Sequence, residues 1–170
     1  AYYNLGAALL KLRRYDQSAD AFRRSAQIAP QDYSGWSGLG DAEYYGGRRP
    51  QAMNDYRKGI ELATAQLKTS PNDAGVLADV AGMDSMIGDA PKAIDLMNRA
   101  LTINHTDPNL MFGAAELYNQ LQQTGPALEW LGKALQAGYP RSVVASAAAL
   151  DNLHSNPRYQ QLMQSTQQKP

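Results

Sequence analysis

The sequence contains no cysteine and only two histidines among its 170 residues. Without a thiol, disulfides, thiolate metal ligands and cysteine nucleophiles are excluded. Neither His105 nor His154 has a second histidine or a carboxylate at the spacing of a metal site such as HExxH. The glycines at 35, 38 and 40 are spaced GxxGxG, which does not match the dinucleotide-binding fingerprint. We therefore expect no enzyme, no metal and no cofactor.

An excess of either charge is also missing, because 16 basic side chains are balanced by 16 acidic ones. Proteins that bind nucleic acid usually carry a basic excess. The basic residues gather at Lys11, Arg13 and Arg14 and again at Arg48 and Arg49, and we expect them to form one small positive edge. Such an edge is too small for a nucleic-acid footprint, so no nucleic-acid partner is predicted.

No apolar run approaches the roughly 20 residues that a membrane-spanning helix needs. The chain opens AYYNLGAALLKL, which is typical of the middle of a helix and lacks a basic leader. We expect the sequence to belong to a longer protein. A cytoplasmic location is favoured, with the periplasm as the alternative.

Alanine and tyrosine are abundant, with 26 alanines and ten tyrosines against two phenylalanines. Alanine at this level favours closely packed helices. A repeat accompanies it, because the pairs Leu5-Gly6 and Leu39-Gly40 are 34 residues apart, and Phe22 and Tyr56 share this interval. The apolar spacing predicts two helices in each unit.

Acidic and basic residues recur four positions apart, at the same place in different repeats. The acidic residue comes first, which is the favourable order on a helix. The residues are Asp20 and Arg24, Asp95 and Arg99, and Glu129 and Lys133. They predict a solvated helix face.

These repeats resemble the tetratricopeptide repeat (TPR) family, whose units carry Trp or Tyr, Leu-Gly, then small, aromatic and small residues before a closing proline. The second unit matches at Trp36, Leu39, Gly40, Ala52, Tyr56 and Gly59, and the first at Tyr2, Leu5, Gly6, Ser18, Phe22, Ser25 and Pro30. The third and fourth units match more weakly, at Gly88, Ala93, Met97 and Ala100 and at Ala114, Ala115, Tyr118, Ala127, Leu131 and Ala134. The resemblance implies an all-α, right-handed α-solenoid of antiparallel helix pairs, with about four hairpins and a terminal cap.

The register divides the chain into a repeat array over 1–140 and a closing segment. The units are expected at 1–32, 33–73, 74–107 and 108–140, with capping helices over 141–166 and a disordered tail over 167–170. The closing prolines Pro30 and Pro71 are 41 residues apart, so the second unit gains seven residues, Ala63–Thr69. This insertion predicts a longer helix, or a contact element for a partner.

The closing segment is expected to begin with a helix over RSVVASAAAL, and a final helix near Asn156-Pro157 shields the last hydrophobic face. The sequence of this segment is similar to the tail that follows TPR arrays in bacterial regulatory proteins.

The resemblance implies that the first helices of the units line a concave groove that binds a peptide or helix of a partner. The predicted groove residues are Tyr3, Asp41, Tyr44, Tyr45, Ser85, Met86, Phe112, Glu116 and Asn119. Either Tyr44 or Tyr45 could instead pack between helices. The carboxylate clamp of chaperone-binding TPRs is not expected, because the matching positions hold no cation and Asp79 would repel a carboxylate.

The sequence therefore predicts a protein–protein interaction scaffold. The alternative is a regulatory or sensory region of a larger bacterial signalling protein, such as a kinase or a transcription regulator. Self-association through the N-terminal repeat is a third interpretation.

Overall fold

The computed structural model describes residues 1–164, which form helices joined by short turns. The predicted tail at 167–170 and the last two residues of the predicted cap, 165–166, lie outside this range. A 3-10 helix, η1, lies between the last two α-helices. The elements are α1 Tyr2–Lys11, α2 Tyr15–Ile28, α3 Tyr33–Tyr45, α4 Arg49–Thr69, α5 Ala74–Ile87, α6 Ala90–Ile103, α7 Pro108–Gln120, α8 Thr124–Gln136, α9 Arg141–Ser146, η1 Ala148–Leu153 and α10 Pro157–Gln164.

Aspartate caps the first helix of three successive hairpins. Asp32 accepts a hydrogen bond from the backbone N–H of Ser34, and Asp107 accepts one from Asn109, at 3.0 and 2.8 Å. At the start of α5, Asp73 accepts from the backbone N–H of Val76 at 3.1 Å. Each aspartate satisfies an N–H group that has no partner inside its helix, so these side chains define where α3, α5 and α7 begin.

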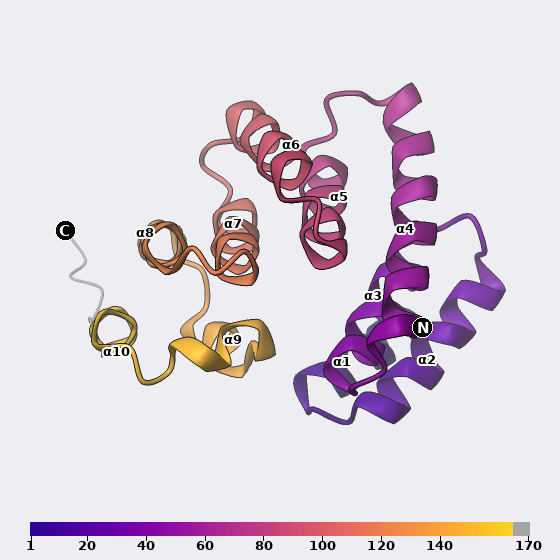
Figure 1. Ribbon diagram of the computed structural model, residues 1–170, viewed down its shortest axis with the longest axis horizontal. Coiled ribbons are helices and arrows are strands. Elements are labelled where there is room, and N and C mark those ends of the chain that lie inside the picture. The colour runs from indigo at the N-terminus through magenta and orange to yellow at the C-terminus, as the bar shows by residue number, and fades with distance from the viewer. Residues whose placement is uncertain (165–170) are drawn as a thin grey trace.

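The helices pack in consecutive pairs, α1 with α2, α3 with α4, α5 with α6 and α7 with α8. The pairs follow one another along an arc, and α9 lies on the open side of this arc (Figure 1). The predicted all-α solenoid is confirmed. Within residues 1–164, no helix has both the length and the apolar character needed to cross a membrane.

The second helix of the second hairpin is longer than its counterparts. Helix α4 has 21 residues, whereas α2 and α6 have 14 each. In its last turns Leu67 is half-buried against the core, while Gln66 and Lys68 are exposed. The additional turns therefore extend the hairpin and leave most of their surface open to solvent.

Small residues occupy the contacts within and between helix pairs. Alanines on both partners are fully buried, and the Phe22 ring of α2 fits between two glycines. A Cβ at Gly6 would lie 2.9 Å from this ring, and one at Gly38 would overlap it. The Tyr56 ring packs against Gly40 in the same way, because a Cβ at Gly40 would lie 2.6 Å from the ring. The glycines at 38 and 40 therefore allow close helix packing.

The C-terminal segment differs from the predicted helix over 141–150. Helix α9 ends at Ser146, Ala147 is extended with ψ 108°, and η1 follows. The side chain of Asn119 on α7 donates a hydrogen bond to the backbone O of Ala149 at 2.6 Å. A helix that continued past Ser146 would direct this carbonyl elsewhere, so the contact accounts for the break. Beyond it, Leu150, Leu153 and Tyr159 are buried together with Leu131 of α8.

The predicted i,i+4 ion pairs are observed in part. Lys133 pairs with Glu129 at 2.9 Å, but Asp20 pairs with Arg23 at i,i+3 and not with Arg24. Arg23 also reaches Glu43, a buried residue of α3, at 3.2 Å, which accounts for the choice of the nearer arginine. Over residues 1–164 no ion pair joins Asp95 to Arg99.

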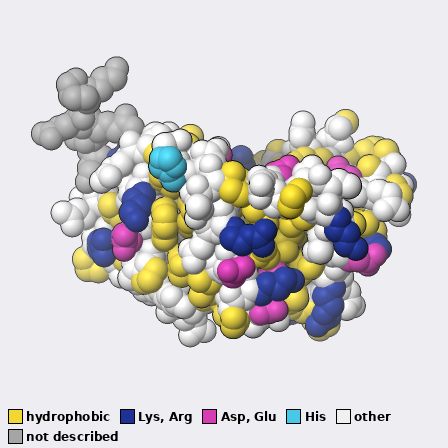
Figure 2. All heavy atoms as spheres, turned by 90° about the horizontal axis from the view of Figure 1, so that it is seen from above, with side chains coloured by type: hydrophobic (Ala, Val, Ile, Leu, Met, Phe, Trp, Pro, Cys, Tyr) yellow, Lys and Arg dark blue, Asp and Glu magenta, His cyan; other side chains and the backbone are white. Residues whose placement is uncertain are grey.

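The predicted positive edge is neutralised in part. Arg48 pairs with Asp16 at 2.6 Å, and Arg13 pairs with Asp151 of η1. On the face drawn in Figure 2, Lys and Arg side chains lie next to Asp and Glu side chains among apolar patches. This face is therefore mixed in charge.

Gly38→Ala should lower the free energy of unfolding by about 1–3 kcal/mol, because the added methyl group overlaps the buried Phe22 ring. Gly82→Ala is the matched control, since Gly82 also lies inside a helix but a Cβ there meets no atom within 4 Å. That change should raise stability by about 0.5–1 kcal/mol. Urea denaturation followed by circular dichroism measures both, and equal effects of the two changes would contradict the packing role of Gly38.

Candidate functional site

A cleft of about 540 Å³ lies between the inner helices and the C-terminal segment. Its walls come from α3, α5 and α7, and residues 146–149 between α9 and η1 close one side. Near α1, Leu10 and Lys11 border it. The predicted open groove is thus a partly covered cleft, since the C-terminal segment lies over it.

Six of the nine residues predicted for the groove line this cleft. Two come from α3, two from α5 and two from α7. The α3 pair and the α7 pair are each four residues apart, which places them on one helix face, whereas the two α5 residues are neighbours in the sequence. The six are Asp41, Tyr45, Ser85, Met86, Phe112 and Glu116.

The other three predicted residues make contacts within the fold and do not border the cleft. Tyr3 packs edge-on against Phe22, with ring centroids 5.5 Å apart. The Tyr44 ring lies under the Arg49 guanidinium at 5.1 Å, and its hydroxyl accepts a hydrogen bond from Gln120 at 3.4 Å. Tyr44 therefore packs between helices, which was the alternative interpretation of this residue.

Asn119, the third of them, holds the C-terminal segment. Besides its bond to the Ala149 carbonyl, its amide donates to Asn152 Oδ1 at 2.8 Å and accepts from Asn152 Nδ2 at 3.2 Å. Asn119 is buried, so these bonds attach η1 firmly to α7. Its role in this structure is to position the cover of the cleft.

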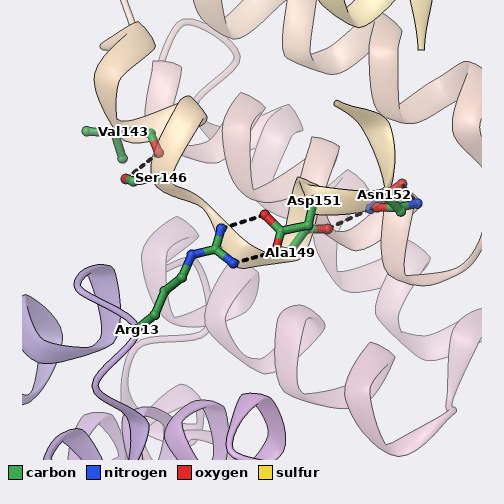
Figure 3. Close-up of polar contacts among 7 residues, drawn as sticks. Arg13, Val143, Ser146, Ala149, Asp151 and Asn152 are labelled. Carbon is green, nitrogen blue, oxygen red and sulfur yellow. Dashed lines mark hydrogen bonds and ion pairs between the residues drawn. The ribbon is translucent and has the colours of Figure 1, made fainter. Parts of the chain in front are cut away.

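A bidentate ion pair joins the first hairpin to η1. The Arg13 Nη1 and Nη2 atoms donate to the two carboxylate oxygens of Asp151 at 2.7 and 2.6 Å (Figure 3). The two residues are 138 positions apart. We call this pair the clasp. It links the two ends of the arc on the side where the C-terminal segment covers the cleft.

The backbone at Arg13 is left-handed, as it is at the matching position of the other three hairpin turns. Arg13 has φ 58° and Gln122 has φ 60°, while Gly47 and Gly88 have φ 84° and 91°. A left-handed conformation costs a non-glycine residue about 1–2 kcal/mol. Because Gln122 adopts the same conformation, the turn at Arg13 gives no sequence signal for the clasp.

Four carboxyl groups line the cleft. One is that of Asp107, which caps α7, and the inner helices α3, α5 and α7 contribute one each. Asp41 accepts a hydrogen bond from the Tyr56 hydroxyl at 2.8 Å, and Asp79 accepts one from the Tyr33 hydroxyl at 2.7 Å. Within the described residues Glu116 has no hydrogen-bond or ion-pair partner.

Burial changes the protonation of these groups. It raises the pKa of Asp41 to about 6, with the charge of Asp79 adding to the effect and the Tyr56 hydroxyl opposing it. Burial raises the pKa of Glu116 to about 8, and the nearby Asp41 charge adds to this shift. The pKa of Asp79 is also raised, chiefly by burial and then by the charge of Asp73, against the opposing hydroxyl of Tyr33. Near neutral pH the cleft therefore holds a protonated Glu116 beside an ionised Asp41.

Aromatic rings and thioethers form the apolar part of the wall. Tyr139 stacks on Phe112 with ring centroids 4.3 Å apart, and Met83 and Met97 lie deeper. Burial and the charge of Glu116 raise the pKa of Tyr139 to about 12, so its hydroxyl stays protonated. Sequence reasoning missed Tyr139 because it lies in the turn before α9, outside the first helices.

Within residues 1–164, no three His, Asp or Glu side chains come together in a way that could hold a metal ion. The cleft carboxylates each lie on a different helix and are spread along the wall. The chemistry available in this part of the chain is therefore hydrogen bonding, charge and apolar contact.

Comparison with known proteins identifies the class. A family model described as "Tetratricopeptide repeat" matches residues 1–32. Superkiller protein 3 of Schizosaccharomyces pombe is 24% identical over 118 residues, which is 69% of this chain and 8% of that protein. The chain thus spans only a small part of this curated relative.

Solved structures share the fold. A thermophilic TPR protein of Thermus thermophilus, TTC0263, is similar with a TM-score of 0.58 and 21% identity, over 88% of this chain and 79% of that one. Pseudomonas aeruginosa pilF is similar with a TM-score of 0.53 and 19% identity, over 95% of this chain and 72% of that one. The first 32 residues thus match the tetratricopeptide repeat, and the described residues share the fold of TPR proteins. TPR proteins generally mediate protein–protein interactions and are typically scaffolds without enzymatic activity.

Arg13→Ala should loosen the C-terminal segment without unfolding the protein. Exposed ion pairs contribute about 0–1 kcal/mol, so the free energy of unfolding should change little. Backbone amides of η1, such as that of Leu150, should exchange with solvent roughly 3- to 10-fold faster. Lys58→Ala removes an exposed ion pair on α4 and is the control. Unchanged exchange in η1 after Arg13→Ala would contradict the role of the clasp.

Glu116→Gln should make stability less dependent on pH. The folded carboxyl keeps its proton to a higher pH than the unfolded one, so the wild-type protein loses stability as pH rises from 5 to 8. The stability of the variant relative to wild type should increase over this range by about 2–4 kcal/mol. Urea denaturation at pH 5 and pH 8 measures the difference, and a constant difference would show that the Glu116 pKa is close to its ordinary value.

Proposed function

We propose that the protein binds a short segment of a partner protein in the cleft. The observation that carries this proposal is the cleft itself, which the inner faces of α3, α5 and α7 form together. A volume of about 540 Å³ lies within the range of ligand pockets. Because three helices of the array contribute to one wall, a segment bound there would contact several repeats at once.

The covered shape favours an extended segment or a loop over a whole helix. An α-helix with its side chains is about 10–12 Å wide and needs a groove open along its length. Here residues 146–149 lie over one side, and the clasp holds the nearby η1 against the first hairpin. A few side chains of a partner fit such a site, and rings beside thioethers offer them apolar contact.

The side chains of the cleft can both contact a bound segment and fix its orientation. Met83, Met86 and Phe112 form apolar wall, and Asp41, Ser85 and Asn109 add hydrogen-bonding groups. Few polar groups within an apolar wall are typical of sites that bind one orientation of a ligand. The interaction class follows from the family, and the cleft is the proposed place of binding.

Selection from a library of short random peptides displayed on phage tests the proposal, with Gly82→Phe as the blocking variant. Gly82 lines the cleft, and a Cβ there meets no atom within 4 Å, so a phenyl ring fills the site without a clash at its base. Peptides that bind the wild-type protein should bind Gly82→Phe at least about 10-fold more weakly, a loss of roughly 1.4 kcal/mol.

Gly125→Phe is the matched control, because Gly125 also has open space around its Cβ position but lies in the first turn of α8, away from the cleft. It should leave peptide affinity unchanged, and circular dichroism should show that both variants are folded. Selected peptides that bind wild type and Gly82→Phe equally would place the site elsewhere, and the absence of any selected peptide would also count against the proposal.

A further inference from the structure

The three carboxyl groups that the inner helices place in the cleft have no cationic partner. Seven acidic side chains of the described range form ion pairs with arginine or lysine, including the buried Asp84 with Lys92. The other nine form none in this range, and Asp41, Asp79 and Glu116 are among them. These three lie along a largely apolar wall, one on each inner helix.

Building on the proposed function, we propose that the bound segment inserts a lysine or arginine side chain into the cleft between these carboxylates, with apolar residues on either side of it. A cation would supply the partner that each carboxylate lacks in the free protein. Opposite charges in a site with little water attract more strongly than on an open surface.

Hydrogen bonding in the cleft leaves acceptors available for such a side chain. The tyrosine hydroxyls occupy only Asp41 Oδ1 and Asp79 Oδ2. Among the described residues, the second oxygen of each carboxylate and both oxygens of Glu116 have no donor. Lysine has three N–H donors and arginine five, so either has donors for these oxygens.

The aromatic residues of the wall suit the same ligand. Tyr45 and Tyr139 both line the cleft, and the charge of Glu116 contributes to the raised pKa of each phenol. A cation near the face of a ring is attracted by about 0.5–2 kcal/mol. Met86 and Phe112 provide apolar contact for the aliphatic stem or for flanking residues.

Lys11 carries the charge opposite to that of the three carboxylates. It is the one lysine or arginine among the described residues that line the cleft, and it lies at the end of α1, exposed and without an ion pair in that range. A ligand carrying a carboxylate would depend on Lys11 and would be repelled by Asp41 and Asp79. A cationic ligand would be hindered by Lys11. Changes at this residue therefore distinguish the two ligand charges.

Isothermal titration calorimetry with three short peptides tests the inference. The peptides are identical except for a central lysine, norleucine or glutamate between leucines. The lysine peptide should bind at least about 10-fold more tightly than the norleucine peptide, and the glutamate peptide should bind most weakly. Equal or weaker binding of the lysine peptide would overturn the inference.

Substitutions test which residues carry the preference for a cationic peptide. Glu116→Gln should weaken the lysine peptide about 10-fold and leave the norleucine peptide unchanged, whereas Lys11→Gln should tighten the lysine peptide. Glu61→Gln on the exposed side of α4 is the control and should change neither. If Lys11→Gln weakens binding, the ligand is anionic and the inference is wrong.

Proton release gives a second readout. Several ionisable groups share the cleft with Glu116: Asp41 and Tyr45 of α3, Asp79 of α5, Asp107 at the start of α7, Tyr139 before α9 and Lys11 of α1. A bound cation lowers the Glu116 pKa from about 8, so binding at pH 7 should release up to about one proton, and affinity for the lysine peptide should increase from pH 6 to pH 8. Calorimetry in buffers of different ionisation enthalpy measures the release. No proton release would overturn the inference.

The two proposals fail in different ways. If peptides bind without preferring a cation but bind Gly82→Phe more weakly than the wild-type protein, only this inference is overturned. The cleft would then remain a peptide site. Lysine peptides that bind Gly82→Phe as well as they bind the wild-type protein would contradict both.

Discussion

The structure depends on the close approach of helices within and between pairs, which small residues at their contacts allow. The Phe22 ring occupies space that a methyl group at Gly38 would fill, and Tyr56 does the same beside Gly40. Interiors are packed tightly, so such contacts fix how one helix lies on the next. Repeated from hairpin to hairpin, they produce the arc whose inner helices α3, α5 and α7 form a single wall (Figure 1).

The C-terminal segment closes one side of this wall. It follows the array, and it is held by Asn119 from α7 and Arg13 from the first hairpin. Burial in the cleft raises the pKa of Asp41 and Glu116. The fold thus loses stability by keeping acidic groups in an apolar cleft, and a cation from a partner would offset that loss.

Sequence periodicity predicted the helices well because each hairpin repeats the same local pattern of small and apolar residues. The same register placed residues such as Asp41, Ser85 and Glu116 on the wall, since residues on one helix face recur at fixed spacing. The clasp and the break after Ser146 were not predicted. Both depend on contacts between segments far apart in the chain, which a local pattern does not encode.

Methyl NMR of methionine tests the central claim, that a cationic segment binds in the cleft, most directly. Met83, Met86 and Met97 line it, whereas Met53 on α4 and Met163 on α10 do not. Titration with the lysine-centred peptide should shift the first three methyl signals and leave the other two in place, and the glutamate-centred peptide should shift none. Shifts confined to Met53 or Met163, or equal shifts with both peptides, would contradict the account.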